Sequence, residues 1–303
     1  MINKKRRLLV TGLTGQVSQS LRQLSPSNSD IFAVGRPHFD LTSRESIYEC
    51  LEQIKCDAII NAAAFTAVDN AEINTEAAWK INADGAGFIA DIAAHLGIPL
   101  LHISTDYVFD GKLSRPYNEQ DPTGPVGVYG QSKLEGERQI VNRHDNYIIL
   151  RTAWVYSPFG TNFVKTILRL RENKNELSIV DDQIGNPTYA IDLASSIVKI
   201  AERILDDKSI ELRGIYHITG SDEGSWADFA EEIIFQTRKF NQSPVYIKRI
   251  TTTDYPTIAK RPSNSRLDNT KLEKNYNIKL PSWKISLEDC ISKIYQPELK
   301  EKK

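Results

Sequence analysis

The chain has 303 residues, of which 40% are hydrophobic, and its 38 basic residues are balanced by 39 acidic ones. A chain of this length can bury a substantial core, and its balanced charge provides no large single-sign field to recruit nucleic acid or an anionic membrane. Neither partner is therefore expected. The three cysteines, Cys50, Cys56 and Cys290, have no CxxC spacing, which argues against a disulfide framework and a structural zinc site.

The sequence also shows no signal for export or membrane insertion. The first ten residues, MINKKRRLLV, are basic, but no apolar signal segment follows them, and nowhere do about eighteen apolar residues run together. We expect a cytoplasmic protein that works in a reducing compartment.

From residue 7 onward, short apolar runs alternate with longer segments of helical period, which is the pattern of βαβ units. The predicted strands cover 7–11, 31–34, 58–61, 99–104 and 147–152. The predicted helices between them cover 16–24, 43–54, 75–96 and 131–143. This pattern predicts an α/β fold with a Rossmann-type doubly wound parallel sheet, in a dinucleotide-binding domain of residues 1–156.

The pattern becomes less regular after about Trp154. Helices are predicted near 160–172, 190–206, 225–238 and 286–294, with strands at 177–180 and 215–219. We interpret residues 157–303 as a smaller, mainly substrate-binding region that closes over the carboxyl ends of the strands, with some elements returning to the sheet.

A glycine-containing turn follows the first predicted strand and opens the first helix. Gly12 allows a tight turn, and Gly15 allows close approach of the backbone to a ligand. The free N–H groups of the helix, beginning at Gln16 and Val17, would then face a diphosphate. Ser18 stands where a typical fingerprint has its last glycine, and serine is small enough to fit.

The end of the second predicted strand indicates which dinucleotide binds. An acidic residue there would accept hydrogen bonds from the adenosine ribose of NAD, but this strand is followed by Gly35 and Arg36. An arginine suits the 2′-phosphate of NADP, so we predict NADPH as the cofactor, with NADH still possible. Asp40 and Leu41 are expected to cover the adenine.

Tyr129 and Lys133 form a Y-x-x-x-K pair at the start of a helix, where a spacing of four places both side chains on one face. A neighbouring ammonium favours the phenolate, so we expect Lys133 to lower the pKa of Tyr129. Two strand ends converge on the same crevice: Ser104 and Thr105 end the fourth strand, and small residues from Ala62 to Ala64 follow the third.

Four stretches of the chain match those of a known family: Thr11 to Gln16, Asn61 to Asp69, Ser104 to Gly111 and Tyr129 to Glu137. They resemble the extended short-chain dehydrogenases and, more narrowly, the dTDP-4-dehydrorhamnose reductases. The resemblance continues through 150–156, 160–163, 182–188 and 261–268, so it spans nearly the whole chain. The stretch from Ser104 to Gly111 and the Arg-Pro-x-Asn segment at 261–264 are specific, whereas the glycine turn is not.

This resemblance implies that Tyr129 protonates the C4 oxygen of a dTDP-4-keto-6-deoxysugar while NADPH delivers a hydride to C4. It implies that Lys133 holds the nicotinamide ribose, that Thr105 hydrogen-bonds near the reacting oxygen, and that Asp106 and Trp154 contact the sugar. The positions that match cofactor contacts are Gly15, Gln16, Val17, Asp40, Leu41, Ala63 and Ala64.

Some relatives bridge two subunits through a metal held by glutamates, one of them on the first helix. Gln19 and Ser20 provide no carboxylate there, so we expect no metal site and a monomer or weak homodimer. For the substrate diphosphate, the available cations are Lys165, Arg169, Arg261 and Arg266.

Three other functions remain open at this point. A dehydratase of this fold would place an Asp-Glu pair after the threonine, but Asp106 and Tyr107 follow Thr105. A nucleotide-sugar 4-epimerase would retain its nicotinamide, whereas Arg36 suggests an exchangeable NADPH. The third alternative is a non-catalytic protein resembling the regulatory β subunit of methionine adenosyltransferase, although Trp154 and the segment 160–163 look more like the reductases.

Overall fold

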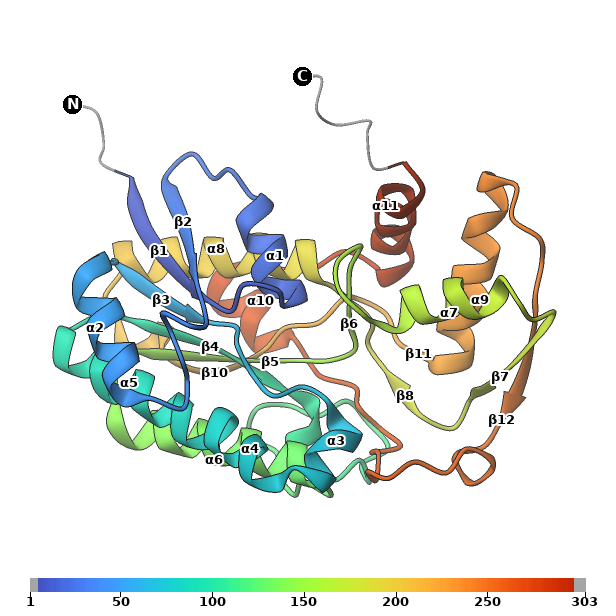
Figure 1. Ribbon diagram of the computed structural model, residues 1–303, viewed down its shortest axis with the longest axis horizontal. Coiled ribbons are helices and arrows are strands. Elements are labelled where there is room, and N and C mark those ends of the chain that lie inside the picture. The colour runs from blue at the N-terminus through green and yellow to red at the C-terminus, as the bar shows by residue number, and fades with distance from the viewer. Residues whose placement is uncertain (1–4, 297–303) are drawn as a thin grey trace.

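The computed structural model describes residues 5–296. Its centre is a six-stranded sheet in the order β10-β5-β4-β3-β1-β2, in which every neighbouring pair is parallel (Figure 1). The strands are β1 (Arg6–Thr11), β2 (Ser29–Val34), β3 (Ala58–Asn61), β4 (Leu100–Thr105), β5 (Tyr147–Thr152) and β10 (Gly214–His217). The predicted Rossmann-type sheet is confirmed, and the strand order reverses between β1 and β3, where sheets of this kind bind ligands.

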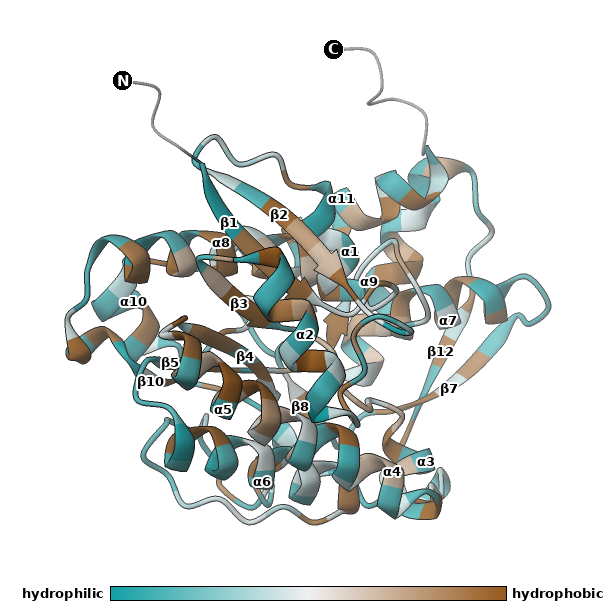
Figure 2. Ribbon diagram, turned by 60° about the vertical axis from the view of Figure 1, so that its left-hand side comes forward, coloured by the Kyte–Doolittle hydropathy of each residue, from teal (hydrophilic) through white to brown (hydrophobic). Residues whose placement is uncertain are grey.

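Helices cover both faces of the sheet, which explains why its strands are continuous apolar runs. Leu8 and Val10 of β1 point to one face and Leu9 to the other, and all three are fully buried. The first face is covered by α1 (Gln16–Gln23), α8 (Ala190–Asp206) and α10 (Thr270–Tyr276), and the second by α2 (Arg44–Ile54), α5 (Gly85–Leu96) and α6 (Val128–Arg143). Figure 2 shows the hydrophobic residues gathered on the strands and on the helix faces that meet them.

A π-helical turn (Lys80–Asp84) joins the short helix α4 (Thr75–Trp79) to α5, where the sequence predicts one uninterrupted helix. Asn82 lies in this turn, and its side chain bonds both backbone groups of Phe65 and the hydroxyl of Ser132 on α6. The turn therefore ties the loop after β3 to the helix that contains Tyr129. The helix α3 (Val68–Ile73), in the same loop, was not predicted.

The C-terminal elements pack around a second core that includes Phe229, Ile233 and Leu287. Its helices are α7 (Phe163–Arg171), α9 (Trp226–Thr237) and α11 (Trp283–Tyr295), and its strands are β7 (Glu176–Val180) and β12 (Tyr246–Ile250), which pair in parallel. Two short pairs connect this core to the sheet: β6 (Val155–Tyr156) with β9 (Thr188–Tyr189), and β8 (Ile184–Gly185) with β11 (Gly224–Ser225). Turns of 3-10 helix lie at Asp106–Val108, Ile210–Leu212, Arg238–Phe240 and Thr252–Asp254.

The chain returns to the sheet after residue 156 through α8, β10 and α10, so the two regions are interleaved in sequence. The division of roles at residue 156 stays a prediction. Within residues 5–296, no helix is both long enough and apolar enough to cross a lipid bilayer.

Candidate active site

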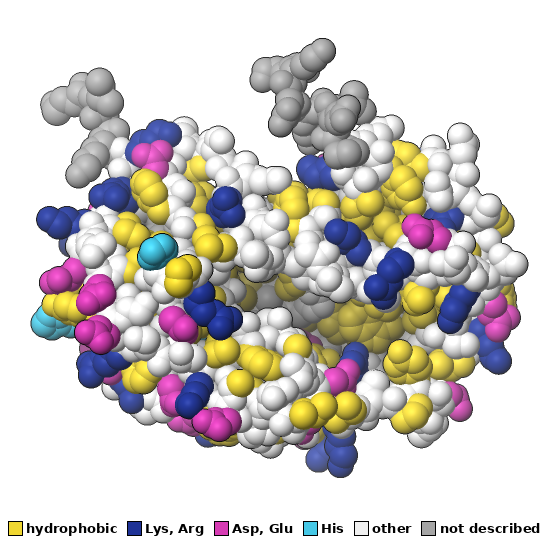
Figure 3. Space-filling model, viewed as in Figure 1, with side chains coloured by type: hydrophobic (Ala, Val, Ile, Leu, Met, Phe, Trp, Pro, Cys, Tyr) yellow, Lys and Arg dark blue, Asp and Glu magenta, His cyan; other side chains and the backbone are white. Residues whose placement is uncertain are grey.

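A cavity of about 820 Å³ lies at the carboxyl ends of β1, β3, β4 and β5, and the C-terminal elements close it on the far side. Figure 3 shows the molecular surface hollowed between these two parts. Every residue predicted from the sequence for catalysis, cofactor binding or contact with the sugar lines this one cavity: Gly12, Gly15, Gln16, Val17, Arg36, Asp40, Leu41, Ala63, Ala64, Thr105, Asp106, Tyr129, Lys133 and Trp154.

The glycine turn takes the conformation that its sequence requires. Gly12 has φ +92°, a region that residues with side chains rarely adopt, and a Cβ atom there would lie 3.4 Å from that of Ala63. Gly15 is the N-cap of α1, and no side chain caps the helix there. The hydroxyl of Ser18 donates to the carbonyl of Gly12, so the residue that replaces the usual glycine closes the turn from within.

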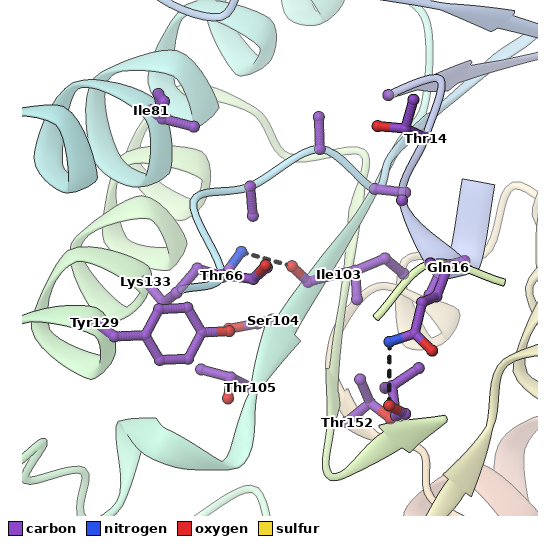
Figure 4. A pocket seen from close by; sticks show the side chains of 18 of the residues that line it. Thr14, Gln16, Thr66, Ile81, Ile103, Ser104, Thr105, Tyr129, Lys133 and Thr152 are labelled. Carbon is purple, nitrogen blue, oxygen red and sulfur yellow. Dashed lines mark hydrogen bonds between the residues drawn. The ribbon is translucent and has the colours of Figure 1, made fainter. Parts of the chain in front are cut away.

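Gln16 lines the cavity, but its amide is bonded to the far wall. Its Nε2 donates to the Val155 carbonyl at 3.2 Å, and its Oε1 accepts from Ser157 at 2.7 Å and from Asn162 at 2.9 Å. Figure 4 shows the first of these bonds spanning the cavity edge. Gln16 therefore couples the turn after β1 to the segment 155–162 on the C-terminal side.

Arg36 lies exposed at the rim of the cavity. Among residues 5–296 it has no hydrogen-bond or ion-pair partner, so its guanidinium is available to a ligand. Asp40 is held in place by Thr42, whose backbone N–H and hydroxyl both donate to it at 2.9 Å. The backbone hydrogen bond from Thr42 lowers the pKa of Asp40, so this carboxylate is charged beside Arg36.

Tyr129 projects from the first turn of α6 toward the end of β4, where Thr105 faces it (Figure 4). Helix α6 begins at Val128, three residues earlier than predicted, so Tyr129 and Lys133 both lie within it. Gly130 lets the helix approach this closely, because a Cβ atom there would be 2.2 Å from the carbonyl oxygen of Tyr107. The ring of Tyr107 meets that of Tyr129 edge-on, with centroids 5.5 Å apart.

The expected lowering of the pKa of Tyr129 is wrong. Burial raises the pKa of Tyr129 to about 12, a hydrogen bond with Thr105 opposes this shift, and the charge of Asp106 adds to it. Lys133 does not reverse the shift, because its Nζ is turned toward the Ile103 carbonyl at 2.7 Å and toward His102 Nε2 at 3.0 Å. Burial also lowers the pKa of Lys133, to about 8.

Three buried polar atoms in the cavity wall have no hydrogen-bond partner within the described chain: Asp106 Oδ2, Thr152 Oγ1 and Arg261 Nε. Burial raises the pKa of Asp106 to about 6. Of the four cations considered for the substrate diphosphate, only Arg261 lines the cavity, and it pairs with Asp69 of α3 at 3.0 Å. The wall thus offers unused donors and acceptors to a polar ligand.

An aromatic shelf, formed by Trp154 and Trp226, closes the other side of the cavity. The two rings stack with centroids 3.5 Å apart and an interplanar angle of 9°, and Phe163 packs against Trp226. Trp154 has φ +47°, an uncommon value for a residue with a side chain. Gly185 makes room for it, because a Cβ there would be 2.5 Å from the indole ring.

The comparisons with known proteins agree with this geometry. Residues 6–296 match the family model described as RmlD substrate binding domain. A protein of Sinorhizobium fredii named dTDP-4-dehydrorhamnose reductase is 45% identical over 280 residues, covering 92% of this chain and 95% of the relative. The chain belongs to the dTDP-4-dehydrorhamnose reductase family.

Other members of the reductase family are similar over their whole length. A reductase of Escherichia coli K12 is 38% identical over 295 residues, covering 95% of this chain and 98% of the relative. The crystal structure of a Bacillus anthracis dTDP-4-dehydrorhamnose reductase in complex with NADP superposes with a TM-score of 0.88 at 35% identity, and the match covers 95% of this chain and 99% of that one. The resemblance inferred from the motifs is confirmed.

Several cavity residues of this reductase-family chain were not predicted. Trp226, Thr152 and Asn162 all line the cavity. Asn162 stands within a matched family segment, which was a usable signal, whereas Trp226 lies far from Trp154 in sequence and only folding brings the two rings together. His102 was also missed because it lies behind the cavity wall, beneath Lys133.

Proposed function

We propose that this chain reduces the C4 keto group of dTDP-4-dehydro-L-rhamnose with NADPH to form dTDP-L-rhamnose. The observation that carries the proposal is the meeting of Tyr129, Thr105 and Lys133 in one cavity with the glycine turn after β1. The names of the relatives at 45% and 38% identity support the choice of substrate.

The residues of the cavity suit a nicotinamide dinucleotide phosphate. The turn at Gly12 and Gly15 and the uncapped start of α1 would hold the diphosphate, because free N–H groups and the positive end of the helix dipole meet there. Arg36 would take the 2′-phosphate through a charge-assisted contact, so NADPH is favoured, while NADH remains usable. When bound, the cofactor supplies a hydride to C4 of the sugar.

Tyr129 acts as the general acid in this proposal. Its raised pKa keeps the hydroxyl protonated at neutral pH, which a proton donor requires. Thr105, whose hydrogen bond with Tyr129 partly offsets that rise in pKa, would bond the same carbonyl oxygen and orient it toward the tyrosine. Lys133 would hold the ribose hydroxyls from below, because its Nζ lies at the cavity floor.

The sugar nucleotide would lie between the catalytic residues and the aromatic shelf. Trp154 offers an apolar face to the deoxysugar, Asp106 offers an unpaired oxygen to a sugar hydroxyl, and Arg261 is placed to meet the diphosphate. We further propose that the protein works in the cytoplasm as a monomer or weak homodimer.

The test is turnover by the purified protein. NADPH and dTDP-4-dehydrorhamnose are mixed with the chain, and the loss of NADPH absorbance is followed. A Tyr129→Phe variant, which keeps the ring and removes the proton donor, serves as the matched control. We expect the wild type to exceed it by at least about 100-fold. Equal rates would contradict the reductase and favour a non-catalytic binding protein.

A further inference from the structure

A chain of buried hydrogen bonds runs from Lys133 across three neighbouring strands of the sheet. Lys133 Nζ lies 3.0 Å from His102 Nε2 on β4, and His102 Nδ1 lies 2.9 Å from Asn61 Nδ2 on β3. The hydroxyl of Thr11 on β1 bonds Asn61 Oδ1 at 2.6 Å, and the backbone N–H of Ala63 bonds that hydroxyl at 3.1 Å. Thr11, Asn61 and His102 are each 1% exposed or less.

The bond from the Ala63 N–H to Thr11, at the end of this network away from Lys133, sets the direction of every other hydrogen bond in it. A backbone N–H can only donate, so Thr11 Oγ1 accepts from Ala63 and donates its own proton to Asn61 Oδ1. Asn61 Nδ2 can in turn only donate, so His102 Nδ1 accepts. Burial lowers the pKa of His102 well below its usual range, so the ring is neutral and its single proton lies on Nε2, facing Lys133.

The reverse orientation of the Asn61 amide leaves the network incomplete. Thr11 Oγ1 would then accept from both Ala63 and Asn61, and its hydroxyl proton would need another acceptor. Within residues 5–296, Thr11 Oγ1 has no third partner, and the residue is fully buried. A buried donor without an acceptor is unfavourable, so the forward direction is preferred.

We propose that His102 is a positioning residue of this site: its Nε2–H donates to the neutral amine of Lys133, holds Nζ beneath the cavity in that form and thereby weakens its hold on a proton. The inference rests on the proposed function for its meaning in catalysis. The network of hydrogen bonds ends at the backbone amide of Ala63, which does not titrate, so the network cannot conduct protons to solvent. It acts by setting the protonation of Lys133.

The other groups that face Lys133 do not replace this effect. Glu137, one turn further along α6, favours the ammonium, but it is itself paired with Arg151 of β5 and bonded by Ser104 of β4. Tyr129 faces Lys133 from the preceding turn and is neutral at physiological pH. The Ile103 carbonyl accepts from Nζ in either protonation state. Burial also disfavours the ammonium, and among the groups that contact Lys133 Nζ, His102 is the one whose hydrogen bond discriminates against it.

The direct test is the titration of Lys133 by NMR in the full chain labelled with 13C at lysine Cε. The Lys133 resonance is identified by its loss in Lys133→Met. His102→Leu removes the donor, and Thr11→Val removes the hydroxyl that fixes the Asn61 amide without touching Lys133. Both should raise the midpoint, by about one pH unit in the first and by less in the second. His102→Gln retains an N–H donor and should stay near the wild type.

An upward shift in both His102→Leu and Thr11→Val, with His102→Gln closer to the wild type, supports the proposal, and any other pattern overturns it. Circular dichroism and Tm identify a variant that fails to fold. If His102→Leu fails to fold, the comparison of the isosteric Thr11→Val variant with His102→Gln decides the test. The titration needs no substrate, so it holds whether or not the chain reduces the keto sugar. If turnover is observed, the pH profile of kcat should shift with the Lys133 midpoint.

Discussion

Gly185→Ala tests the aromatic shelf at a position that touches no ligand in the proposed reaction. The added Cβ would lie 2.5 Å from Cε2 and 2.8 Å from Cζ2 of Trp154. Carbon atoms in contact are usually about 3.5–4.0 Å apart, so the indole must move by about 1 Å. The backbone of Trp154 is already confined at φ +47°, and Trp226 stacks against the Trp154 ring. The shelf cannot absorb the methyl group without strain.

Two consequences are expected from this displacement. Overpacking of this kind costs about 1–3 kcal/mol of stability, which thermal unfolding measures as a lower Tm. A misplacement of about 1 Å beside a reacting sugar can cost up to about 100-fold in turnover. We expect the loss in kcat/KM for the sugar nucleotide, with the Kd for NADPH nearly unchanged, because the glycine turn and Arg36 lie elsewhere in the cavity wall.

Gly124→Ala is the matched control. A Cβ at that position would meet only Asp110 Cβ, at 3.5 Å, which is an ordinary contact. The reasoning about the shelf is refuted if Gly185→Ala and Gly124→Ala have the same Tm and the same kinetic constants, because Trp154 would then not be wedged against residue 185.

Three further variants probe other parts of the site. Arg36→Ala should weaken NADPH binding by about 10–100-fold and leave NADH binding unchanged, as measured by fluorescence titration; equal losses would show that Arg36 does not contact the 2′-phosphate. Asp106→Asn should be more stable than the wild type above pH 6, by up to about 3 kcal/mol. Burial raises the pKa of Asp106 to about 6, so the wild type loses stability as the pH rises from about 4 to about 6, whereas the asparagine does not titrate. Below about pH 4 the two should unfold alike, and a constant difference across this range would refute the shift. Glu137→Gln breaks the buried pair with Arg151 and should cost about 3–5 kcal/mol in urea unfolding; a neutral result would show that the pair is dispensable.

Much of the fold could be predicted from local patterns. Short apolar runs located all six strands of the sheet, including β10, which was predicted at 215–219, because strands buried on both faces must be apolar throughout. The strand β12 was missed because Lys248 and Arg249 are exposed and interrupt its pattern. Helix α10 was missed because it has only seven residues, few of them apolar.

The sequence by itself also located the candidate site, because each of its motifs is short and stands at a strand end or a helix start. Gly12 and Thr105 needed only the rule that the carboxyl ends of parallel strands share one edge of the sheet, whereas Tyr129 was assigned from its Y-x-x-x-K motif at a helix start and from the family resemblance. The spacing of four residues along the sequence was enough to place Lys133 one helical turn from Tyr129.

Only the tertiary structure decided how these groups are tuned. The pKa of Tyr129 moved in the direction opposite to the prediction, because burial by surrounding segments raises it and Lys133 Nζ is turned toward His102 and the Ile103 carbonyl. His102 under Lys133 and Trp226 on Trp154 are contacts between elements distant in sequence. Spacing along the chain determines which side chains share a helix face or a sheet edge, but desolvation and buried hydrogen bonds depend on what packs against them, and that is settled only when the whole chain has folded.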